Sequence, residues 1–326
     1  MNVEARNARM EADLRLAHRY SVRVLEPSPP AVDDGEFYAD DPAVAGGNGE
    51  EGRPIVGPTV NANISWLSLC DGEPLLAKWC EARWLGPWPR LEPVPDGWAE
   101  TREAMRRLAC YVLAPARKAA NGKIGLRYTY GGFGTPFFGA DEQLRVEGDA
   151  LIRQRDGDAE LLKIMSLAEV AAFAGVTLSE DPGVGSDLPG LGDPDAALPI
   201  DPSAAARLGD WYGFSASVLE QFRAELNAAG RACGRVQIWP EHFDMGCNIE
   251  GVNFGCSPGD GSLVEPYIYV GPWNTEGLAD SDFWNAAFGA VLPYNELLGV
   301  SDQRETALGF LRRGAGLALQ RAGEKP

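Results

Sequence analysis

Histidine is nearly missing from this chain, which carries only two among its 326 residues, at His18 and His242. Enzymatic metal centres usually gather several imidazole or thiolate ligands, so isolated histidines argue against such a centre. The six cysteines include no CxxC pair, and six thiols in a chain of this length do not make a disulfide scaffold. We therefore expect no metal site, and the sequence identifies no cofactor.

Clusters of basic residues are also missing. Lys and Arg together number 29 against 47 Asp and Glu, which gives the acidic chain a formal net charge of −18. Nucleic acids and anionic membranes are bound through cationic patches, so we expect neither as a partner. A small molecule or a protein remains possible as the ligand. The strong preference for arginine over lysine suggests a bacterial genome rich in G and C.

Long hydrophobic runs are absent as well. No segment approaches the roughly 18 apolar residues of a membrane span. The first twenty residues, MNVEARNARMEADLRLAHRY, are charged throughout and lack the apolar centre of a secretory signal. Hydrophobic residues make up 45% and charged residues 23%, as in ordinary globular proteins. These features predict a soluble cytoplasmic protein.

The beginning of the chain differs in composition from the rest. Residues 27–54 are rich in Pro, Gly, Asp and Glu, and they carry too little apolar surface to offset the entropy of ordering. We therefore predict a largely flexible extension over residues 1–60 and one compact domain over residues 61–322. Five of the nine tryptophans lie within residues 61–98, where we expect them to seal one side of the core.

The compact part shows helical and strand patterns in turn. Apolar spacing predicts long helices over 99–120, 201–229 and 302–321, a short helix opened by Ser166 and Glu169, and an interrupted helix over 281–298. Alternating patterns predict strands over 123–130, 143–146, 150–154, 160–164 and a strand pair within 234–273. Short turns link several of these strands, which indicates an α+β fold with mainly antiparallel sheet and flanking long amphipathic helices. Each β region follows a long helix, so the domain could also be read as two diverged β-plus-helix halves.

Six short motifs follow one another along the chain in a characteristic order. They are LAPAR at a helix end, GTPFFG, EGDALIRQRDGD, WPEHFD, EPYIYVGPW and LPYNELL. In this order they resemble a family of uncharacterised bacterial proteins, a domain of unknown function, over about residues 108–320. The resemblance implies a strand of the W-P-x-H-F-D type. It implies no catalytic residue, because none is established for that family.

The segment 234–273 holds the densest group of candidate site residues. From residue 243 onward its apolar and polar residues alternate, and side chains two apart in a strand share a face. One face would carry Phe243, Met245, Cys247 and Ile249, and the other His242, Asp244, Asn248 and Glu250. The polar row is either a binding site or the solvated side of a half-buried sheet.

His242 and Asp244 form the leading catalytic candidate, because a carboxylate beside an imidazole can orient it for proton transfer. Glu250 on the same face, or Glu265 from the partner strand, would complete the site together with Asn248. Two alternatives remain open. The histidine is structural, bonded to Asp244 beneath the aromatic cluster, or it activates the thiol of Cys256.

Two glycine-rich segments are candidate ligand loops. Residues 131–139 read GGFGTPFFG, where aromatic side chains such as Phe137 would line the mouth of a pocket or cover the core. Residues 255–261 read GCSPGDG, which lacks the GK[ST] ending of a phosphate-binding loop and predicts a turn between strands.

Two functions are consistent with these residues. The favoured one is a binding protein without chemistry of its own, which holds a small molecule or a partner. The alternative is a hydrolase-like enzyme that uses His242 and Asp244 as an acid–base pair. The position of the largest pocket distinguishes them, because a pocket lined by His242, Asp244 and Glu250 favours chemistry, whereas their exposure on a flat sheet face favours binding or structure.

Overall fold

The structure is a computed structural model that describes residues 90–129, 131–135, 142–155, 158–275 and 282–319. It also describes two short strands, β1 (Phe37–Tyr38) and β2 (Ile55–Val56), which pair antiparallel. Apart from these two strands, the predicted extension over 1–60 lies outside the described residues. So do the tryptophans before residue 90, the segment around Phe137 and the predicted domain boundary near residue 60.

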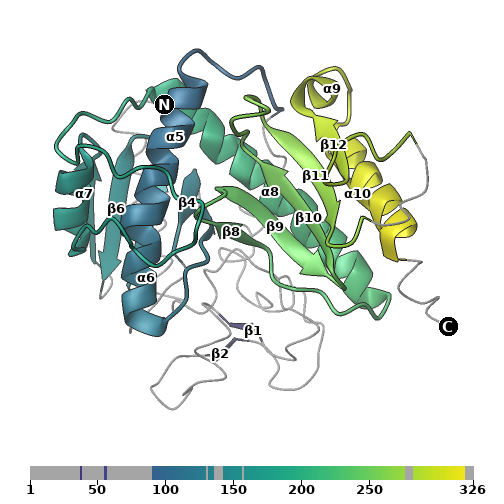
Figure 1. Cartoon of the computed structure of the whole chain (residues 1–326), viewed down its shortest axis with the longest axis horizontal. Coiled ribbons are helices and arrows are strands. Elements are labelled where there is room, and N and C mark those ends of the chain that lie inside the picture. The colour runs from purple at the N-terminus through teal and green to yellow at the C-terminus, as the bar shows by residue number, and fades with distance from the viewer. Residues whose placement is uncertain are drawn as a thin grey trace, which may run out of the picture.

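The described chain runs twice from helix into sheet (Figure 1). The first helical segment consists of α5 (Trp98–Leu108), the π-helical turn η4 (Ala109–Leu113) and α6 (Ala114–Asn121). Five strands follow, β3 (Arg127–Thr129), β4 (Gly132–Gly134), β5 (Gln143–Glu147), β6 (Ala150–Arg155) and β7 (Asp158–Lys163). The short helix α7 (Leu167–Ala174) closes this half.

The second half repeats this order with a longer helix. After an irregular segment, α8 (Pro202–Ala228) leads into five more strands. They are β8 (Gln237–Trp239), β9 (Asp244–Ile249), β10 (Val252–Ser257), β11 (Tyr267–Pro272) and β12 (Ala290–Pro293). The chain continues into α9 (Tyr294–Leu298) and α10 (Gln303–Leu319).

Both sheets are antiparallel meanders in which each strand pairs with its neighbours in the chain. Their orders are β3-β4-β5-β6-β7 and β12-β11-β10-β9-β8. Two backbone hydrogen bonds join the sheets at their edges, from Leu126 N to Ile238 O (2.8 Å) and from Ile238 N to Leu126 O (2.6 Å). Every pairing within the two sheets is antiparallel, so the predicted α+β class is confirmed.

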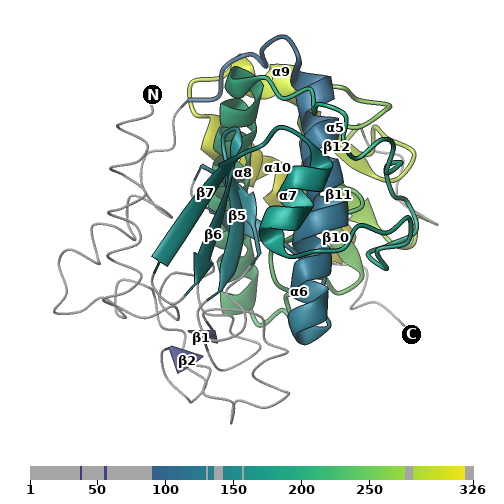
Figure 2. The same cartoon turned by 90° about the vertical axis from the view of Figure 1, so that its left-hand side faces the viewer.

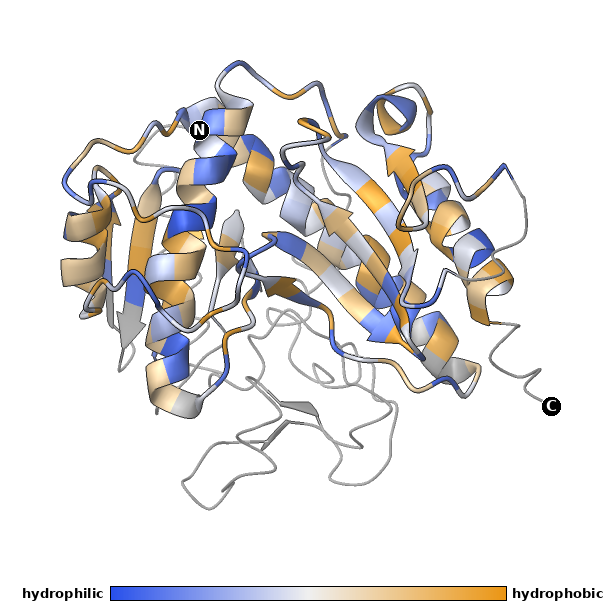
Figure 3. Ribbon diagram, in the orientation of Figure 1, coloured by the Kyte–Doolittle hydropathy of each residue, from blue (hydrophilic) through white to orange (hydrophobic). Residues whose placement is uncertain are grey.

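One hydrophobic core extends through both halves. Helix α8 packs against α5 and α10, and it contacts strands of both sheets (Figures 1 and 2). The buried apolar residues of α5, α8 and the inner sheet faces form a continuous cluster. Figure 3 shows hydrophilic and hydrophobic residues interleaved along α5 and along the strands of the second sheet. These elements therefore bury one face and leave a polar face outside.

Helix boundaries follow the sequence signals closely. The Ser166 hydroxyl accepts a hydrogen bond from the Glu169 amide (3.3 Å), and the Asp201 carboxylate caps α8 by accepting from the Ser203 and Ala204 amides (2.9 and 3.0 Å). Pro115 lies in the first turn of α6. Proline lacks an N–H and crowds the preceding turn, and the π-helical turn η4 ends two residues before it.

Two predictions of secondary structure are wrong. Residues 281–298 were expected to be mainly helical, yet residues 290–293 form strand β12, and only residues 294–298 are helical. The apolar run at 290–292 pairs with β11, and this sheet contact outweighs its helical spacing. The WPEHFD segment is not a continuous strand either. Its first residue ends β8, its last begins β9, and a tight turn lies between them.

A cleft over the second sheet as the candidate site

A cleft of about 660 Å³ lies between helix α5 and the polar face of the second sheet. Its walls come from α5, the segment 175–201, the β8–β9 turn, the β10–β11 connection and strand β11. The lining side chains most relevant to binding are Arg102, Arg106, Asp187, His242, Asp244, Asp260, Tyr267, Tyr269 and Phe288. Residues from both halves of the chain therefore form this cleft.

The β8–β9 turn lines the cleft and holds Phe243 in an unusual conformation. Phe243 has a φ of 57°, in the left-handed region that residues other than glycine seldom adopt. Its amide donates to the Trp239 carbonyl (2.6 Å), and its carbonyl accepts from the Tyr212 hydroxyl (2.7 Å). Its buried ring packs edge-on against Phe133 and Tyr212. Packing thus holds a conformation that costs about 1–3 kcal/mol, and such residues cluster at functional sites.

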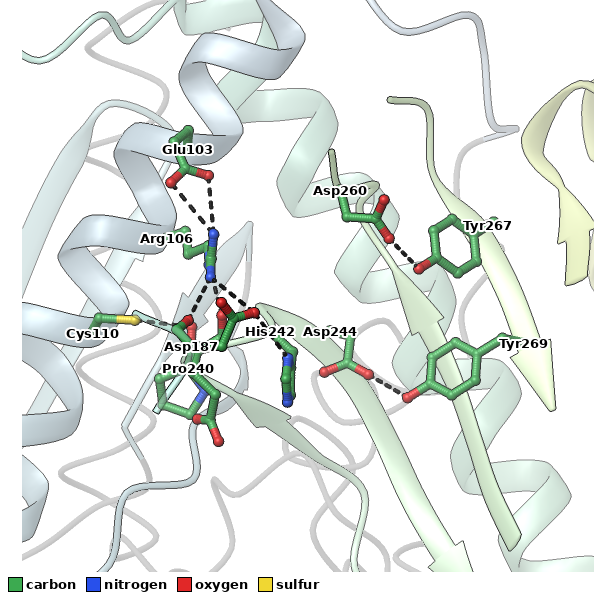
Figure 4. A network of polar contacts seen from close by, with 11 residues as sticks. Glu103, Arg106, Cys110, Asp187, Pro240, His242, Asp244, Asp260, Tyr267 and Tyr269 are labelled. Carbon is green, nitrogen blue, oxygen red and sulfur yellow. Dashed lines mark hydrogen bonds and ion pairs between the residues drawn. The ribbon is translucent and has the colours of Figure 1, made fainter. Parts of the chain in front are cut away.

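Asp244 is the most buried acid of the cleft, with 9% of its surface exposed. It begins strand β9, directly after the strained Phe243. Its Oδ2 accepts a hydrogen bond from the Tyr269 hydroxyl, whereas its buried Oδ1 has no hydrogen-bond partner among the described residues. Figure 4 shows one carboxylate oxygen turned toward Tyr269 and the other toward the His242 side of the cleft. A buried acceptor without a partner is costly in a folded protein, so this oxygen requires an explanation.

Tyr269 reaches Asp244 by lying across the intervening strand. It stands on β11 opposite Gly255 of β10, and Asp244 belongs to β9 beyond it. A methyl group at position 255 would overlap the Tyr269 ring, and one at Gly246 would lie 3.2 Å from its hydroxyl oxygen. The two glycines therefore leave the space in which the tyrosine side chain rests on the sheet.

Burial controls the ionisation of this pair. Desolvation raises the pKa of Asp244 above its ordinary value of 3.8, and it outweighs the opposing effects of the Tyr269 hydrogen bond, of nearby His242 and of the Asp244 backbone amide. Burial, followed by the charge of Asp244, raises the pKa of Tyr269 well above 10. Tyr269 consequently stays protonated and acts as a fixed hydrogen-bond donor.

Asp260 supplies a second carboxylate with a different environment. Burial by itself would raise its pKa, but a hydrogen bond from Tyr267 (2.6 Å), two backbone amides and the charge of Arg102 together lower it. The amides belong to Ser262 (2.6 Å) and Leu263 (2.9 Å). Asp260 therefore keeps a negative charge in the cleft and organises the β10–β11 connection around itself.

The two arginines of the cleft hold its walls together. Arg102 donates to the Val264 carbonyl (2.9 Å). Arg106 donates from Nε to the Glu241 carbonyl and from Nη2 to the Asp187 carbonyl, both at 2.7 Å (Figure 4). Main-chain carbonyls from three loops thus converge on the guanidinium groups of α5.

His242 lies at the edge of the cleft, in the turn between the strands. Its side chain is 59% exposed, and its Nδ1 is 3.9 Å from a carboxylate oxygen of Asp187. Figure 4 places the ring between Asp187 and Asp244. The alternative in which the imidazole is bonded to Asp244 and buried beneath the aromatic cluster is therefore wrong. Among the described residues, the carboxylate within 4 Å of the imidazole belongs to Asp187.

The other predicted site residues lie farther away. Asn248 shares the outer face of β9 with Asp244 and donates a hydrogen bond to Asn253 (2.8 Å). It lines an adjoining cavity of about 400 Å³ together with His242 and Asp244. Glu250 lies in the β9–β10 turn at a φ of 51° and pairs with Arg231 (2.6 Å). Glu265 is exposed in the β10–β11 connection and does not line the cleft. The alternation therefore places Asp244 and Asn248 on one face of β9, whereas His242 and Glu250 lie in the turns before and after this strand.

The cysteines of the second sheet lie on its other face. Cys256 is fully buried in the core, and burial raises the pKa of its thiol to about 12. Burial also raises the pKa of Cys247. A thiol becomes nucleophilic as the thiolate, so neither side chain is reactive at neutral pH. The dyad of Cys256 and His242 is wrong because the two side chains lie on opposite sides of the sheet.

The sequence did not predict several residues of the cleft. Tyr267 and Tyr269 are two apart in EPYIYVGPW, and this spacing on a partner strand would have placed them on the face of Asp244. Asp260 was assigned to a simple turn. Arg102 and Arg106, one helical turn apart on α5, gave no local signal, because their partners are carbonyls more than a hundred residues away or in distant loops.

Within the described part of the chain, no three His, Cys, Asp or Glu side chains come together in a way that would hold a metal ion. None of the helices described is both long and apolar enough to cross a membrane. Comparison with protein-family models, curated proteins and solved structures finds no match for this chain. Its resemblance to a family of uncharacterised bacterial proteins stays a prediction, and function must be inferred from the cleft.

Proposed function

We propose that this protein binds a small polar molecule in the cleft between α5 and the second sheet. A volume of about 660 Å³ lies within the usual range for small-molecule sites, roughly 300–1,000 Å³. Aromatic walls from Tyr267, Tyr269 and Phe288 are combined with a few polar groups, the composition expected of such a site. A concave site favours a small ligand over a flat protein partner.

The observation that carries this proposal is the carboxylate of Asp244. It is buried at the base of the cleft, and one of its oxygens has no hydrogen-bond partner among the described residues. A strained residue precedes it, and a tyrosine that requires two glycines orients it. This arrangement is unfavourable for stability, which is the pattern expected when a ligand completes the polar network.

The proposal is tested with three probes that share a ring and differ in charge, namely benzyl alcohol, benzylammonium and benzoate. Binding is followed by chemical shifts of the backbone amides of Gly259 and Gly261, which line the cleft. We expect at least one probe to shift these amides. Ser262→Trp, which fills the cleft, should abolish the shift, whereas Ser301→Trp, at an exposed position outside the cleft lining, should preserve it. Failure of all three probes would contradict the proposal.

A hydrolase-like enzyme is the second candidate. His242 is accessible at the cleft edge beside Asp187, and Asp244 is a buried acid with a raised pKa a short distance along the chain. Two titratable groups in contrasting environments are typical of an acid–base pair. Because the thiols of Cys247 and Cys256 are unreactive, His242 would activate a water molecule as the nucleophile.

Chromogenic p-nitrophenyl esters and glycosides test this second candidate. The wild-type protein should release p-nitrophenol faster than His242→Ala by at least about a hundredfold, the typical contribution of one general base. Equal rates for the two proteins would exclude this role of the histidine and leave the binding function intact.

We also expect the protein to act in the cytoplasm. The four cysteines of the described residues are free and buried, which suits a reducing compartment. Fractionation of the source cells with an antibody to the chain tests this expectation, and recovery in a secreted or membrane fraction would contradict it.

A further inference from the structure

We propose that the ligand of this cleft carries a protonated amine, which donates a hydrogen bond to Oδ1 of Asp244. This inference rests on the proposed binding function and specifies the chemistry of the ligand. Three features of the cleft support it: a buried acid with one unbonded oxygen, the hydrogen bonds that already engage the cleft arginines, and an exposed aromatic ring that lines the same cleft.

The first feature is the charge of Asp244. A neutral hydroxyl group would satisfy the hydrogen bond of Oδ1 but would bring no positive charge to the buried carboxylate. A buried charge is stable when it is both hydrogen-bonded and paired with an opposite charge. Tyr269 already provides the neutral hydrogen bond to Oδ2. An ammonium group would supply the charge that the carboxylate lacks.

The second feature is that neither cleft arginine makes a hydrogen bond or ion pair with Asp244. Arg102 donates to the Val264 carbonyl, and Arg106 donates to the carbonyls of Glu241 and Asp187. Both guanidinium groups are therefore engaged in shaping the walls. The arginines keep their positive charges, and Arg106 also pairs with Glu103 and Asp187. Four acids nevertheless line the cleft against two arginines, namely Glu103, Asp187, Asp244 and Asp260, so its field favours a cation over an anion.

The third feature is the ring of Phe288, which is 46% exposed and lines the same cleft. It stands edge-on to the Tyr269 ring, with the two centroids 6.2 Å apart. The face of an aromatic ring attracts a cation through its quadrupole. Two aromatic side chains, Tyr269 and Phe288, therefore line the cleft that an ammonium group would enter.

A protonated Asp244 is the rival explanation, in which the carboxyl group donates its own proton to a hydrogen-bond acceptor on the ligand. The two cases respond oppositely to charge and to pH. An amine competes with the proton for Asp244 and binds less tightly as the pH falls. An acceptor ligand such as a carboxylate requires that proton and binds more tightly as the pH falls.

Isothermal titration of the full chain with benzylammonium, benzyl alcohol and benzoate separates these cases. At about pH 8 we expect benzylammonium to bind at least tenfold more tightly than benzyl alcohol, because a charge-assisted bond is about twice as strong as a neutral one. Its affinity should fall as the pH is lowered toward the ordinary carboxyl pKa of 3.8, because Asp244 then takes up a proton. Equal affinities of the amine and the alcohol, or tighter binding of benzoate at low pH, would overturn the amine proposal while leaving small-molecule binding in place.

Two charge-matched variants locate the effect. Asp244→Asn should weaken benzylammonium binding about tenfold or more and change benzyl alcohol binding by less than about threefold. Asp187→Asn removes the same charge from an exposed side chain of the same cleft, and screening should limit its effect to about twofold. An equal loss in both variants would mean that the cleft attracts cations only through its diffuse charge, and the pairing with Asp244 would be wrong. If none of the three probes binds the wild type, the proposed function itself fails.

Discussion

The two sheets of this protein share one topology but differ in how the polar side chains on one face are paired. Each is a five-stranded antiparallel meander that follows a helical segment. In the first sheet the outer face of β5 carries Gln143, Arg145 and Glu147, all buried. In the second sheet the outer face of β9 carries Asp244 at the base of an open cleft.

The difference lies in how the buried charges are paired. Arg145 and Glu147 form an ion pair at 3.1 Å, and each side chain is 4% exposed. Gln143 donates to the Thr135 carbonyl (3.0 Å). Asp244 has Tyr269 on one oxygen and no hydrogen-bond partner on the other among the described residues. A polar sheet face whose groups bind one another contributes to structure, whereas a face with an unmatched buried acid is prepared for a ligand.

Removing a charge from the first sheet should give the largest effect. In Glu147→Gln, Arg145 would stay buried without its counter-charge, and breaking a buried pair in this way costs about 3–5 kcal/mol. Urea denaturation, followed by far-UV circular dichroism, should show this loss in the free energy of unfolding. A change below about 1 kcal/mol would show that the pair is not what stabilises the first sheet, and the comparison would fail.

Filling the space beneath Tyr269 should have the next largest effect. The added methyl group of Gly255→Ala overlaps the tyrosine ring, so the ring must move away from Asp244 at a cost of about 1–3 kcal/mol. Gly271→Ala is the control on the neighbouring strand, where the nearest atoms are 3.8 Å from the added carbon. Thermal melts of both variants test this, and equal stabilities would contradict the described packing of Tyr269.

Neutralising Asp244 should change stability in the opposite direction from neutralising Glu147. Asn can still accept the Tyr269 hydroxyl, and the substitution removes an uncompensated buried charge, so at pH 7 Asp244→Asn should gain about 1 kcal/mol. Because folding raises the pKa of Asp244, the protonated carboxyl group favours the folded state of the wild type. This contribution to the free energy of unfolding is complete below the ordinary pKa of 3.8, and it is lost as the pH rises through the pKa of the folded state.

The gain of Asp244→Asn should therefore disappear as the pH approaches 3.8. Urea midpoints measured at several pH values for both proteins test the sign. If Asp244→Asn is less stable than the wild type at pH 7, Asp244 stabilises the fold as Glu147 does, and the contrast between the two sheets is wrong.

Removing His242 should have the smallest effect on stability. Its imidazole is 59% exposed and takes no part in the core. We expect His242→Ala to change the free energy of unfolding by less than about 0.5 kcal/mol, as for most surface substitutions. A loss above about 2 kcal/mol in denaturant titrations would show that the β8–β9 turn depends on this side chain.

Local sequence signals predicted most of the framework. The caps at Ser166 and Asp201 depend on neighbours within three residues, and the strand alternation after Phe243 correctly predicted the buried face of β9. The cleft was not predictable in this way. Asp244 could be chosen as a candidate, but its environment depends on Tyr269, which lies 25 residues away, and on a space left by Gly255. Such a site depends on the register of three strands, which periodicity alone does not specify.

The pKa of Asp244 in the free protein tests the central claim most directly. Carboxyl carbon shifts of ¹³C-labelled wild-type protein, assigned with Asp244→Asn, would follow this titration. We predict a pKa above the ordinary 3.8 in the free protein, and a fall on saturation with benzylammonium, because a bound cation favours the ionised form. A pKa at or below 3.8 without ligand would show that Asp244 is already compensated, and would contradict the account.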